Sequence, residues 1–317
     1  MGLFLLHLDD ALERQPETLK VTRAKNAHEA HFAEISKHFR LWGNGTVLAN
    51  FRARLKDEIQ AQNDNKPLLT FAGSGDFHHI TQLIISCLME GNDEKITVVH
   101  FDNHPDWVHF NDGMHCGSWV NKALEIPNVE KVVTIGVCSE DLKNPEFKGA
   151  NLANMKAGKI ELFPFSHRPS FVLKQYGERP GYSQKGKYIT WNNIAEQKEE
   201  EFLGTLLKQI NTKTIYITVD KDVLDFEDAI TNWDQGKMRL PFLLKVLRRL
   251  AANFNLLGVD VVGDYSQPKY AGGKFEVFKK RAEIYMDQPK MKFDEAEIIK
   301  RNTASNLALL NVFEEFL

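Results

Sequence analysis

Six short apolar runs recur along the chain, and they constrain its fold more than any other feature. They occupy residues 67–76, 95–102, 131–138, 159–165, 214–220 and 256–264. Runs that are apolar almost throughout are typical of strands buried on both faces of a parallel sheet. Amphipathic segments at 79–91, 199–210 and 240–254 predict helices between them. The alternation predicts an α/β fold with a single doubly wound, mainly parallel sheet and helices on both faces.

The organisation of the rest of the chain follows from the lack of any repeat or low-complexity linker. We predict one domain over residues 1–317, with a helical N-terminal segment at about 10–65 and a closing helix at about 293–317. The aromatic and leucine spacing at 307–317 is that of a packing face, which could also bury against a second subunit of a homo-oligomer.

Charge and cysteine content exclude several classes of partner. The chain has 40 Lys and Arg against 43 Asp and Glu, a net charge of −3, and so lacks the basic footprint of a protein that binds nucleic acid or an anionic membrane. It has no apolar stretch of about 20 residues, and we do not expect its first residues, which lack a basic start and have only a short apolar run, to act as a secretory leader. Three cysteines make a disulfide framework improbable, so we expect a reducing cytoplasm.

Three of the apolar runs end in clusters of residues that can bind metal. These clusters are GSGDFHH at 73–79, DNHPD at 102–106 and VDKDVLD at 219–225. Ligands of open parallel sheets bind beyond the carboxyl ends of the strands, where these clusters are expected to lie. Carboxylates and imidazoles suit Mn²⁺, Fe²⁺ or Zn²⁺, and the lack of paired cysteines argues against a structural zinc site.

The second and third clusters share one geometry. Asp102, His104 and Asp106 alternate, so in an extended segment they project to the same side, and Asp220 and Asp222 repeat this spacing. Each cluster alone could be a polar turn or a solvated strand end. Their agreement favours a metal site, because crowded carboxylates repel one another unless a dication lies between them.

The three clusters, in this order and spacing, resemble the arginase/agmatinase (ureohydrolase) superfamily over about residues 67–265. The resemblance implies an arginase-like three-layer α/β/α fold and two Mn²⁺ ions that activate water to cleave a guanidino group into urea and an amine. GSGDFHH, DNHPDW and TNWDQGKM are more similar to a divergent branch that includes the peptide arginases. The implied metal ligands are His78, Asp102, His104, Asp106, Asp220 and Asp222.

The resemblance also implies roles outside the metal shell. His115, in DGMHCGSW, takes the place of the family's proton-shuttling histidine, and Asp106 is counted with it as catalytic. The family's metal-binding histidine directly follows Gly-Asp, where this chain has Phe77. We therefore assign His78 by a shift of one residue, with His79 as the alternative.

Two departures concern the substrate. Arginases hold the guanidinium with a glutamate after the last core strand, where this chain has Gly263. We expect Asp264 to replace it, although a turn-forming role is equally compatible. Asp234 is a second candidate for contact with a cationic substrate, and residues 166–188 could form a loop that holds a peptide or simply a solvated connection.

The residues that would hold a free amino acid are not recognisable in HFNDGMH. The predicted activity is therefore a dinuclear manganese hydrolase that converts arginine in a peptide to ornithine. Alternatives are an amidinohydrolase for free arginine, agmatine or another small guanidino compound, a one-zinc deacetylase-like hydrolase, and a relic that keeps metal without catalysis.

Overall fold

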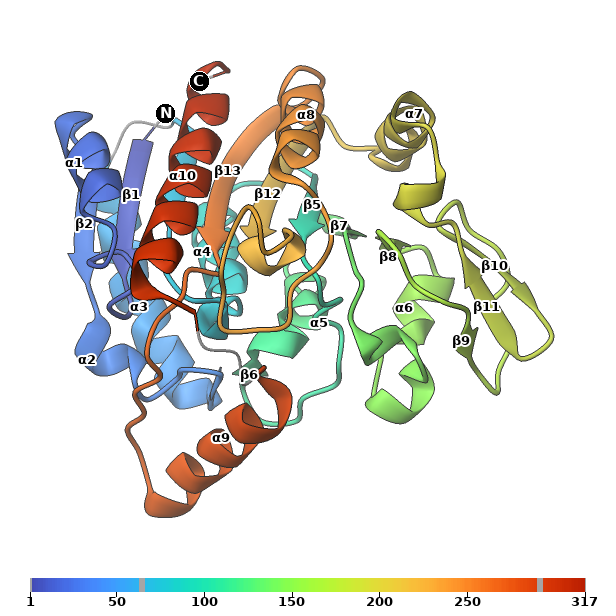
Figure 1. Cartoon of the computed structure of the whole chain (residues 1–317), viewed down its shortest axis with the longest axis horizontal. Helices are drawn as coiled ribbons and strands as arrows, with labels where there is room; N and C mark the ends of the chain where they lie inside the picture. Colours follow the sequence, from blue (N-terminus) through green and yellow to red (C-terminus); the bar gives the residue numbers. More distant parts are fainter. Residues whose placement is uncertain (1, 63–65, 290–292, 317) are drawn as a thin grey trace.

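Eight parallel strands form the centre of the molecule (Figure 1), which confirms the predicted parallel sheet. Six of them correspond to the predicted apolar runs, whereas the strands at Gly2–His7 and His28–His31 were not predicted. The structure is a computed structural model that describes residues 2–62, 66–289 and 293–316. The strand order is β2-β1-β4-β13-β12-β5-β7-β8. Their bounds, in chain order, are β1 Gly2–His7, β2 His28–His31, β4 Leu68–Phe71, β5 Ile96–Phe101, β7 Val129–Ile135, β8 Ile160–Phe163, β12 Thr214–Asp220 and β13 Asn255–Val262.

Helices cover both faces of the sheet and bury two separate cores. One core includes Phe51, Ile84 and Trp119 and lies under α3 (Gly45–Ala61), α4 (Ile80–Leu88), α5 (Trp119–Ala123) and α6 (Leu152–Lys156). The other lies under α1 (Pro16–Ala24), α7 (Glu199–Gln209), α8 (Leu240–Ala251) and α10 (Glu295–Glu314). Figure 1 shows α8 and α10 in front of the sheet and α3 and α4 behind it, which gives three layers.

The N-terminal segment differs from the helix predicted at about 10–65. It contains α1, the short α2 (Ala33–Ser36) and α3, but β2 lies between them and extends the sheet beside β1, with Phe4 opposite His28 and His7 opposite His31. The sequence HEAH gives no apolar pattern for this strand, because an edge strand is only partly covered. Of its four residues only Ala30 is buried. Residues 63–65 of the predicted segment lie outside the described residues.

Elements outside the large sheet complete the fold. Residues 166–188, predicted as a loop, contribute most of a three-stranded antiparallel sheet made of β9 (Ser170–Phe171), β10 (Tyr182–Lys185) and β11 (Tyr188–Trp191). A two-stranded pair joins β3 (Trp42–Gly43) to β6 (Met114–His115). Helix α9 (Lys274–Asp287) was not predicted.

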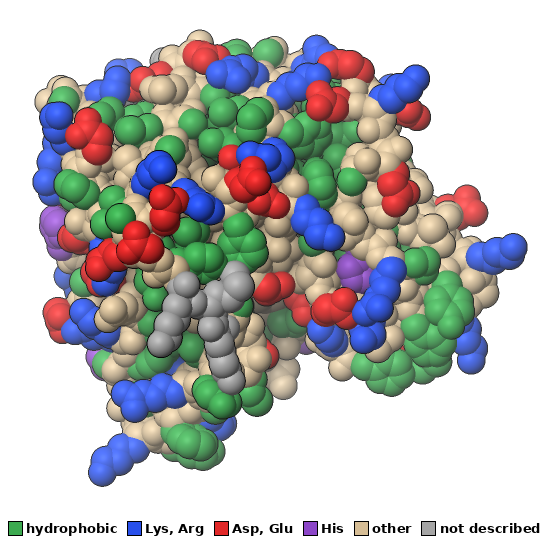
Figure 2. Space-filling view, in the orientation of Figure 1, with side chains coloured by type: hydrophobic (Ala, Val, Ile, Leu, Met, Phe, Trp, Pro, Cys, Tyr) green, Lys and Arg blue, Asp and Glu red, His purple; other side chains and the backbone are tan. Residues whose placement is uncertain are grey.

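The closing helix predicted at about 293–317 corresponds to α10, and its predicted last residue, Leu317, lies outside the described residues. Within the described ranges, no helix is both long and apolar enough to span a bilayer. Figure 2 shows acidic and basic side chains mixed over one face of the molecule, in keeping with the small net charge. The prediction of one domain stays a prediction.

Candidate metal centre and its cavity

The candidate centre lies where three strands end at the same edge of the sheet. β5 and β12 are neighbours, with Phe101 opposite Val219, so Asp102 and Asp220 emerge side by side. β4 runs on through a short 3₁₀ turn at Gly75–Phe77, which places His78 next to them. Strand pairing thus brings together residues that are more than a hundred positions apart in the sequence.

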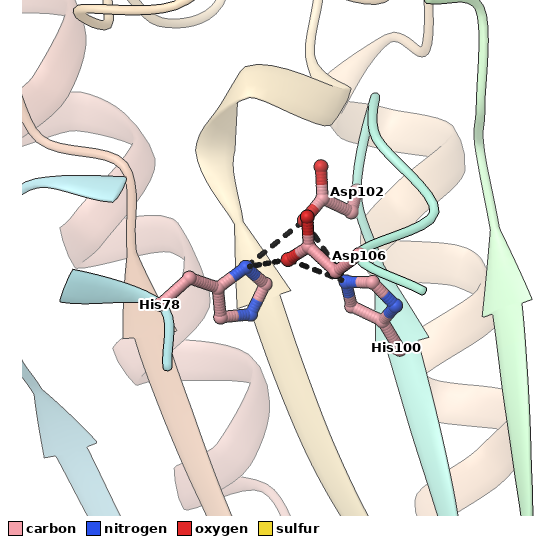
Figure 3. A group of neighbouring side chains, drawn as sticks. All are labelled: His78, His100, Asp102 and Asp106. Carbon is pink, nitrogen blue, oxygen red and sulfur yellow. Dashed lines mark hydrogen bonds and ion pairs between the residues drawn. The ribbon is translucent and has the colours of Figure 1, made fainter. Parts of the chain in front are cut away.

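His78 faces three carboxylates (Figure 3 shows two of them). Its Nδ1 lies 2.9 Å from Asp102 Oδ2, 3.1 Å from Asp106 Oδ2 and 3.6 Å from Asp220 Oδ2, yet it forms no hydrogen bond of acceptable geometry. Its Nε2 donates to Thr218 Oγ1 at 3.0 Å, because the Thr218 hydroxyl proton is given to Asp260. Nδ1 therefore faces negative charge, which either a proton on the ring or a cation between the ring and the carboxylates would neutralise.

A second group lies around His104, whose Nδ1, unlike that of His78, has hydrogen-bond geometry to a carboxylate. Its Nδ1 lies 3.0 Å from Asp222 Oδ2 and 3.4 Å from Asp102 Oδ1. Its Nε2 donates to Asp234 Oδ1 at 2.9 Å. A carboxylate that accepts the far ring N–H is the usual way of fixing the tautomer of a metal-binding histidine. Asp102 belongs to both groups, so the two candidate ion positions share a carboxylate.

Two further side chains hold the carboxylates in place. His100 donates from Nε2 to Asp102 Oδ2 at 2.9 Å, and its Nδ1 lies 3.1 Å from Thr134 Oγ1. Trp119 Nε1 donates to Asp106 Oδ2 at 2.6 Å. Asp106 adopts a left-handed backbone (φ 48°), which is uncommon for a residue with a side chain and typical of functional sites.

The charges of the metal-free group are strongly perturbed. Burial and the charge of Asp102 raise the pKa of Asp106 and that of Asp220 to about 6, and the pKa of Asp222 well above its usual value. Burial would also raise the pKa of Asp102, but three histidines around it hold that pKa well below the ordinary value. Burial also opposes a positive charge on His78. The adjacent carboxylates of Asp102 and Asp106 outweigh this effect of burial and raise the pKa of His78.

The donor set fits two divalent cations. It consists of carboxylate oxygens and imidazole nitrogens, which suit Mn²⁺, Fe²⁺ or Zn²⁺. In both groups a ring nitrogen is oriented toward carboxylates while the other ring nitrogen is held by a hydrogen bond. His78 and Asp106 could serve one ion, His104 and Asp222 the other, with Asp102 and Asp220 between them. The assignment of these six ligands stays a prediction.

The structure turns His78, and not His79, toward the carboxylates. His79 is fully buried beside Phe39, with ring centroids 6.2 Å apart. Burial and the nearby charges of His115 and Lys280 hold the pKa of His79 well below its ordinary value. The extra residue Phe77 is accommodated because the chain makes a 3₁₀ turn at Gly75–Phe77 before the helix begins.

A cavity of about 490 Å³ opens onto the centre and contains His115. The Gly117 backbone N–H donates to His115 Nδ1 at 2.8 Å, so the ring proton is on Nε2, which lies 2.5 Å from Glu283 Oε1 of α9. An imidazole held in this way at the cavity wall can give or take a proton. The predicted catalytic role of His115 stays a prediction.

Asp264 does not line the cavity, contrary to its predicted role as the substrate grip. Its carboxylate is buried and pairs with the Lys221 ammonium and with Asn306 Nδ2 at 3.0 Å. Gly263 cannot be replaced by a larger residue either, because it has a left-handed backbone (φ 93°) and a Cβ there would lie 2.3 Å from Asp220 Oδ1. The end of β13 therefore provides no carboxylate for a substrate.

Asp234 lines the cavity as predicted for a wall residue, but its oxygens are already used. Oδ1 accepts from His104, and Oδ2 accepts from Asn103 Nδ2 at 3.1 Å. Its contact with substrate stays a prediction. Residues 166–188 are absent from the described lining of the cavity, so their predicted role in holding a peptide has no support in the structure.

Two features of the site escaped sequence analysis. His100 could have been predicted as a site residue, because it is a histidine within an apolar run and points to the same side as Asp102 two residues later. Glu283 could not have been predicted from the sequence, because it lies on an unpredicted helix and reaches the site only through tertiary packing.

Comparisons with known proteins show a family match over part of the chain and a shared fold. Residues 11–163 match the sequence profile of the Arginase family. A Thermotoga maritima protein, described as an uncharacterized protein, is 28% identical over 197 residues, which are 62% of this chain. The matched region spans 58% of the length of that relative.

Solved structures of similar fold include several hydrolases. Arginase from Bacillus caldovelox gives a TM-score of 0.60 at 13% identity, covering 98% of each chain. A hypothetical agmatinase from Burkholderia thailandensis gives 0.56 at 15%, covering 99% of this chain and 85% of that one. Formimidoylglutamase from Bacillus subtilis gives 0.57 at 16%, covering 99% and 87%. At these identities the likeness is one of fold.

Proposed function

We propose that this chain is a member of the arginase (ureohydrolase) superfamily and that it is a dinuclear manganese hydrolase that releases urea from the arginine side chain of a peptide. The observation that carries the proposal is the pair of histidines, His78 and His104. Each has one ring nitrogen fixed by a hydrogen bond and the other facing carboxylates at the floor of a cavity.

The residues of the site have separate roles in the proposed reaction. Two Mn²⁺ ions, when bound, lower the pKa of water so that a nucleophile is available near neutral pH. His100 and Trp119 keep Asp102 and Asp106 oriented through hydrogen bonds of 2.9 and 2.6 Å. His115 carries its proton on Nε2 at the cavity wall, where it can protonate the amine that departs from the guanidino carbon.

The charges that line the cavity favour a cationic substrate that carries no carboxylate of its own close to the cationic group. Its described lining includes Glu140, Asp141, Glu283 and Asp287 near the mouth, and Lys148 is the one lysine or arginine among the lining residues. A guanidinium is attracted by such a wall, whereas the α-carboxylate of free arginine would meet mostly negative charge. Arginine within a peptide has no free α-carboxylate, which supports a peptide substrate over free arginine.

The test is a turnover assay of the manganese-loaded protein. Nα-acetyl-L-arginine amide, a panel of arginine-containing peptides, agmatine and free arginine are each incubated with the protein, and urea release and the product mass are recorded. We expect urea and an ornithine product from peptides, with free arginine the poorest substrate. Turnover of agmatine alone would indicate a small-molecule amidinohydrolase.

Control variants separate catalysis from metal content. His115→Ala should keep its bound manganese and lose turnover by about a hundredfold or more, since general acid catalysis contributes on that order. Asp220→Asn should lose metal and turnover together. Asp93→Asn, an exposed change outside the cavity lining, should alter neither. If the loaded wild-type protein releases no urea from any of these compounds, the proposed activity is wrong.

We also propose a reducing, cytoplasmic setting. Cys87, Cys116 and Cys138 are free thiols, and Cys116 and Cys138 flank the cavity region without pairing.

A further inference from the structure

Helix α9 is attached to the rest of the molecule by polar contacts. Lys280 Nζ donates to the His38 carbonyl at 2.9 Å and lies 4.4 Å from the Trp42 ring centre. Gln288 Nε2, just after the helix, donates to Asp76 Oδ1 at 3.0 Å. Glu283 contacts His115 at 2.5 Å. The helix is thus positioned by a few specific groups, one of which reaches the cavity.

Glu283 is oriented toward the cavity from the inner side of α9. Its side chain keeps 24% of its surface exposed, and it lines the cavity together with Met286 and Asp287. The same helix carries Phe275 and Phe278 on its outer side, where they are largely exposed. Hydrophobic side chains are visible in Figure 2 at the lower end of the molecule, where Figure 1 places α9.

Apart from Asp287, which ends the same helix as Glu283, the other carboxylates around the mouth of the cavity are already paired. Asp234 accepts from His104 and Asn103. Glu140 accepts from Arg168 with both oxygens, at 3.0 and 2.8 Å. Asp141 lies 3.3 Å from Lys148 Nζ. Glu283, by contrast, contacts a histidine that does not need a carboxylate to hold its tautomer, because the Gly117 N–H already does so.

The end of β13 cannot supply a carboxylate, since a Cβ at Gly263 would collide with Asp220 and Asp264 is paired to Lys221. A guanidinium in the cavity still needs a partner, because a buried cation without one is strongly disfavoured.

We propose that Glu283 is the substrate-binding residue that pairs with the cationic end of the substrate, so that specificity for a guanidinium comes from α9. The inference rests on the proposed function for its choice of ligand. On binding, Glu283 accepts hydrogen bonds from the guanidinium and His115 Nε2 is freed toward the reacting nitrogen. A planar guanidinium offers paired N–H donors that match one carboxylate.

The experiment measures binding as well as turnover. Nα-acetyl-L-arginine amide and its neutral isostere, Nα-acetyl-L-citrulline amide, are titrated by calorimetry into the wild-type protein, Glu283→Gln and Glu276→Gln. Gln at 283 can still accept from His115, so it preserves any purely structural contact while removing the charge. Glu276, on the same helix, pairs with Lys280 at 3.3 Å, lies outside the cavity lining and is the matched control.

We expect the wild type and Glu276→Gln to prefer the arginine amide over the citrulline amide by about tenfold or more. Glu283→Gln should lose that preference, and its KM for the arginine amide should rise by a similar factor with a smaller change in kcat. If Glu283→Gln keeps both the preference and the KM of the wild type, the assignment of Glu283 is wrong.

The two proposals fail in different ways. Urea release by wild type with an unchanged KM in Glu283→Gln would overturn the role of Glu283 and leave the proposed activity intact. A charge preference that depends on Glu283, without urea release from any compound, would overturn the activity and keep the binding role.

Discussion

Lys221 and Asp264 form a buried ion pair directly behind the candidate metal centre. Lys221 lies between Asp220 and Asp222 in the sequence, but its side chain is directed away from them and is fully buried. Burial lowers the pKa of Lys221, and the charge of Asp264 counteracts that shift. The pair therefore keeps a cation close to the carboxylates without placing it in the cavity, which makes Asp264 a structural residue.

Replacing Asp264 tests this structural role. Asp264→Asn leaves a buried ammonium without its counter-charge, and such a loss costs about 3–5 kcal/mol of unfolding free energy. Urea unfolding followed by circular dichroism would measure it, with Asp93→Asn as a surface control expected within about 0.5 kcal/mol of wild type. If Asp264→Asn instead has the stability of the wild type but binds arginine amide more weakly, Asp264 is a substrate-binding residue.

Residues at strand ends were the part of the site that sequence could predict. Asp102 and Asp220 end apolar runs, so local pattern and the geometry of parallel sheets suffice to bring them together, and Asp106 follows Asp102 in the same loop. Asp264 also follows a strand, but its direction depends on packing against Lys221 and α10, which no local pattern records. Glu283 depends on the docking of a separate helix.

At the scale of elements, α9 differs from the other long helices in how it is held. Helices α8 and α10 bury leucines and valines in the core, whereas Lys280 is the buried residue of α9. Polar anchors give less stabilisation than a buried apolar face, so α9 should open more readily than the sheet. Its sequence also lacks a clear apolar stripe, which is why it was not predicted.

Removing one anchor should loosen this helix alone. In Lys280→Met the hydrogen bond to the His38 carbonyl is lost, worth about 1 kcal/mol, so amide exchange over residues 274–287 should become about fivefold faster. Hydrogen–deuterium exchange read by mass spectrometry would show it, with β5 and β12 unchanged. Lys279→Met, at the exposed neighbouring position, is the matched control. Equal exchange in both variants would contradict the anchoring role.

The strands show where element prediction succeeds and fails. The central strands β5, β7 and β12 were predicted because both their faces are buried, which leaves an unbroken apolar run. β2 was missed because it lies at the edge of the sheet, where the selection for apolar residues is weak. β1 was also not predicted, although five of its six residues are buried, so burial alone does not explain which strands the sequence pattern reports.

At the scale of the whole molecule, the metal-free protein should lose stability as the pH rises. The native pKa of Asp106 and of Asp220 is about 6, against an unfolded value of 3.8, so the native state binds more protons between these values. The raised pKa of His78 and of His104 continues this trend above the ordinary histidine value of 6.5. Unfolding free energy therefore falls through this window and is lowest above pH 6.

Bound Mn²⁺ should offset this loss of stability at higher pH, because it supplies the positive charge that bound protons supply at lower pH. We expect the rise in Tm on adding Mn²⁺ to be small near pH 5 and to grow by several degrees toward pH 7.5, an effect of a few kcal/mol. Differential scanning calorimetry with and without a chelator would measure it. Asp220→Asn should show little dependence of this kind, and an equal Mn²⁺ effect at both pH values would contradict the expectation.

The order of strands in the sheet has a consequence for how the molecule is made. β4 and β5 follow each other in the chain, yet β13 and β12 lie between them in the sheet. Until the last third of the chain has been synthesised, both strands present unpaired edges and the core above them is incomplete. We therefore expect that the first half of the chain, although residues 11–163 match the Arginase family profile, does not fold independently, and that any metal binding follows the placement of β12.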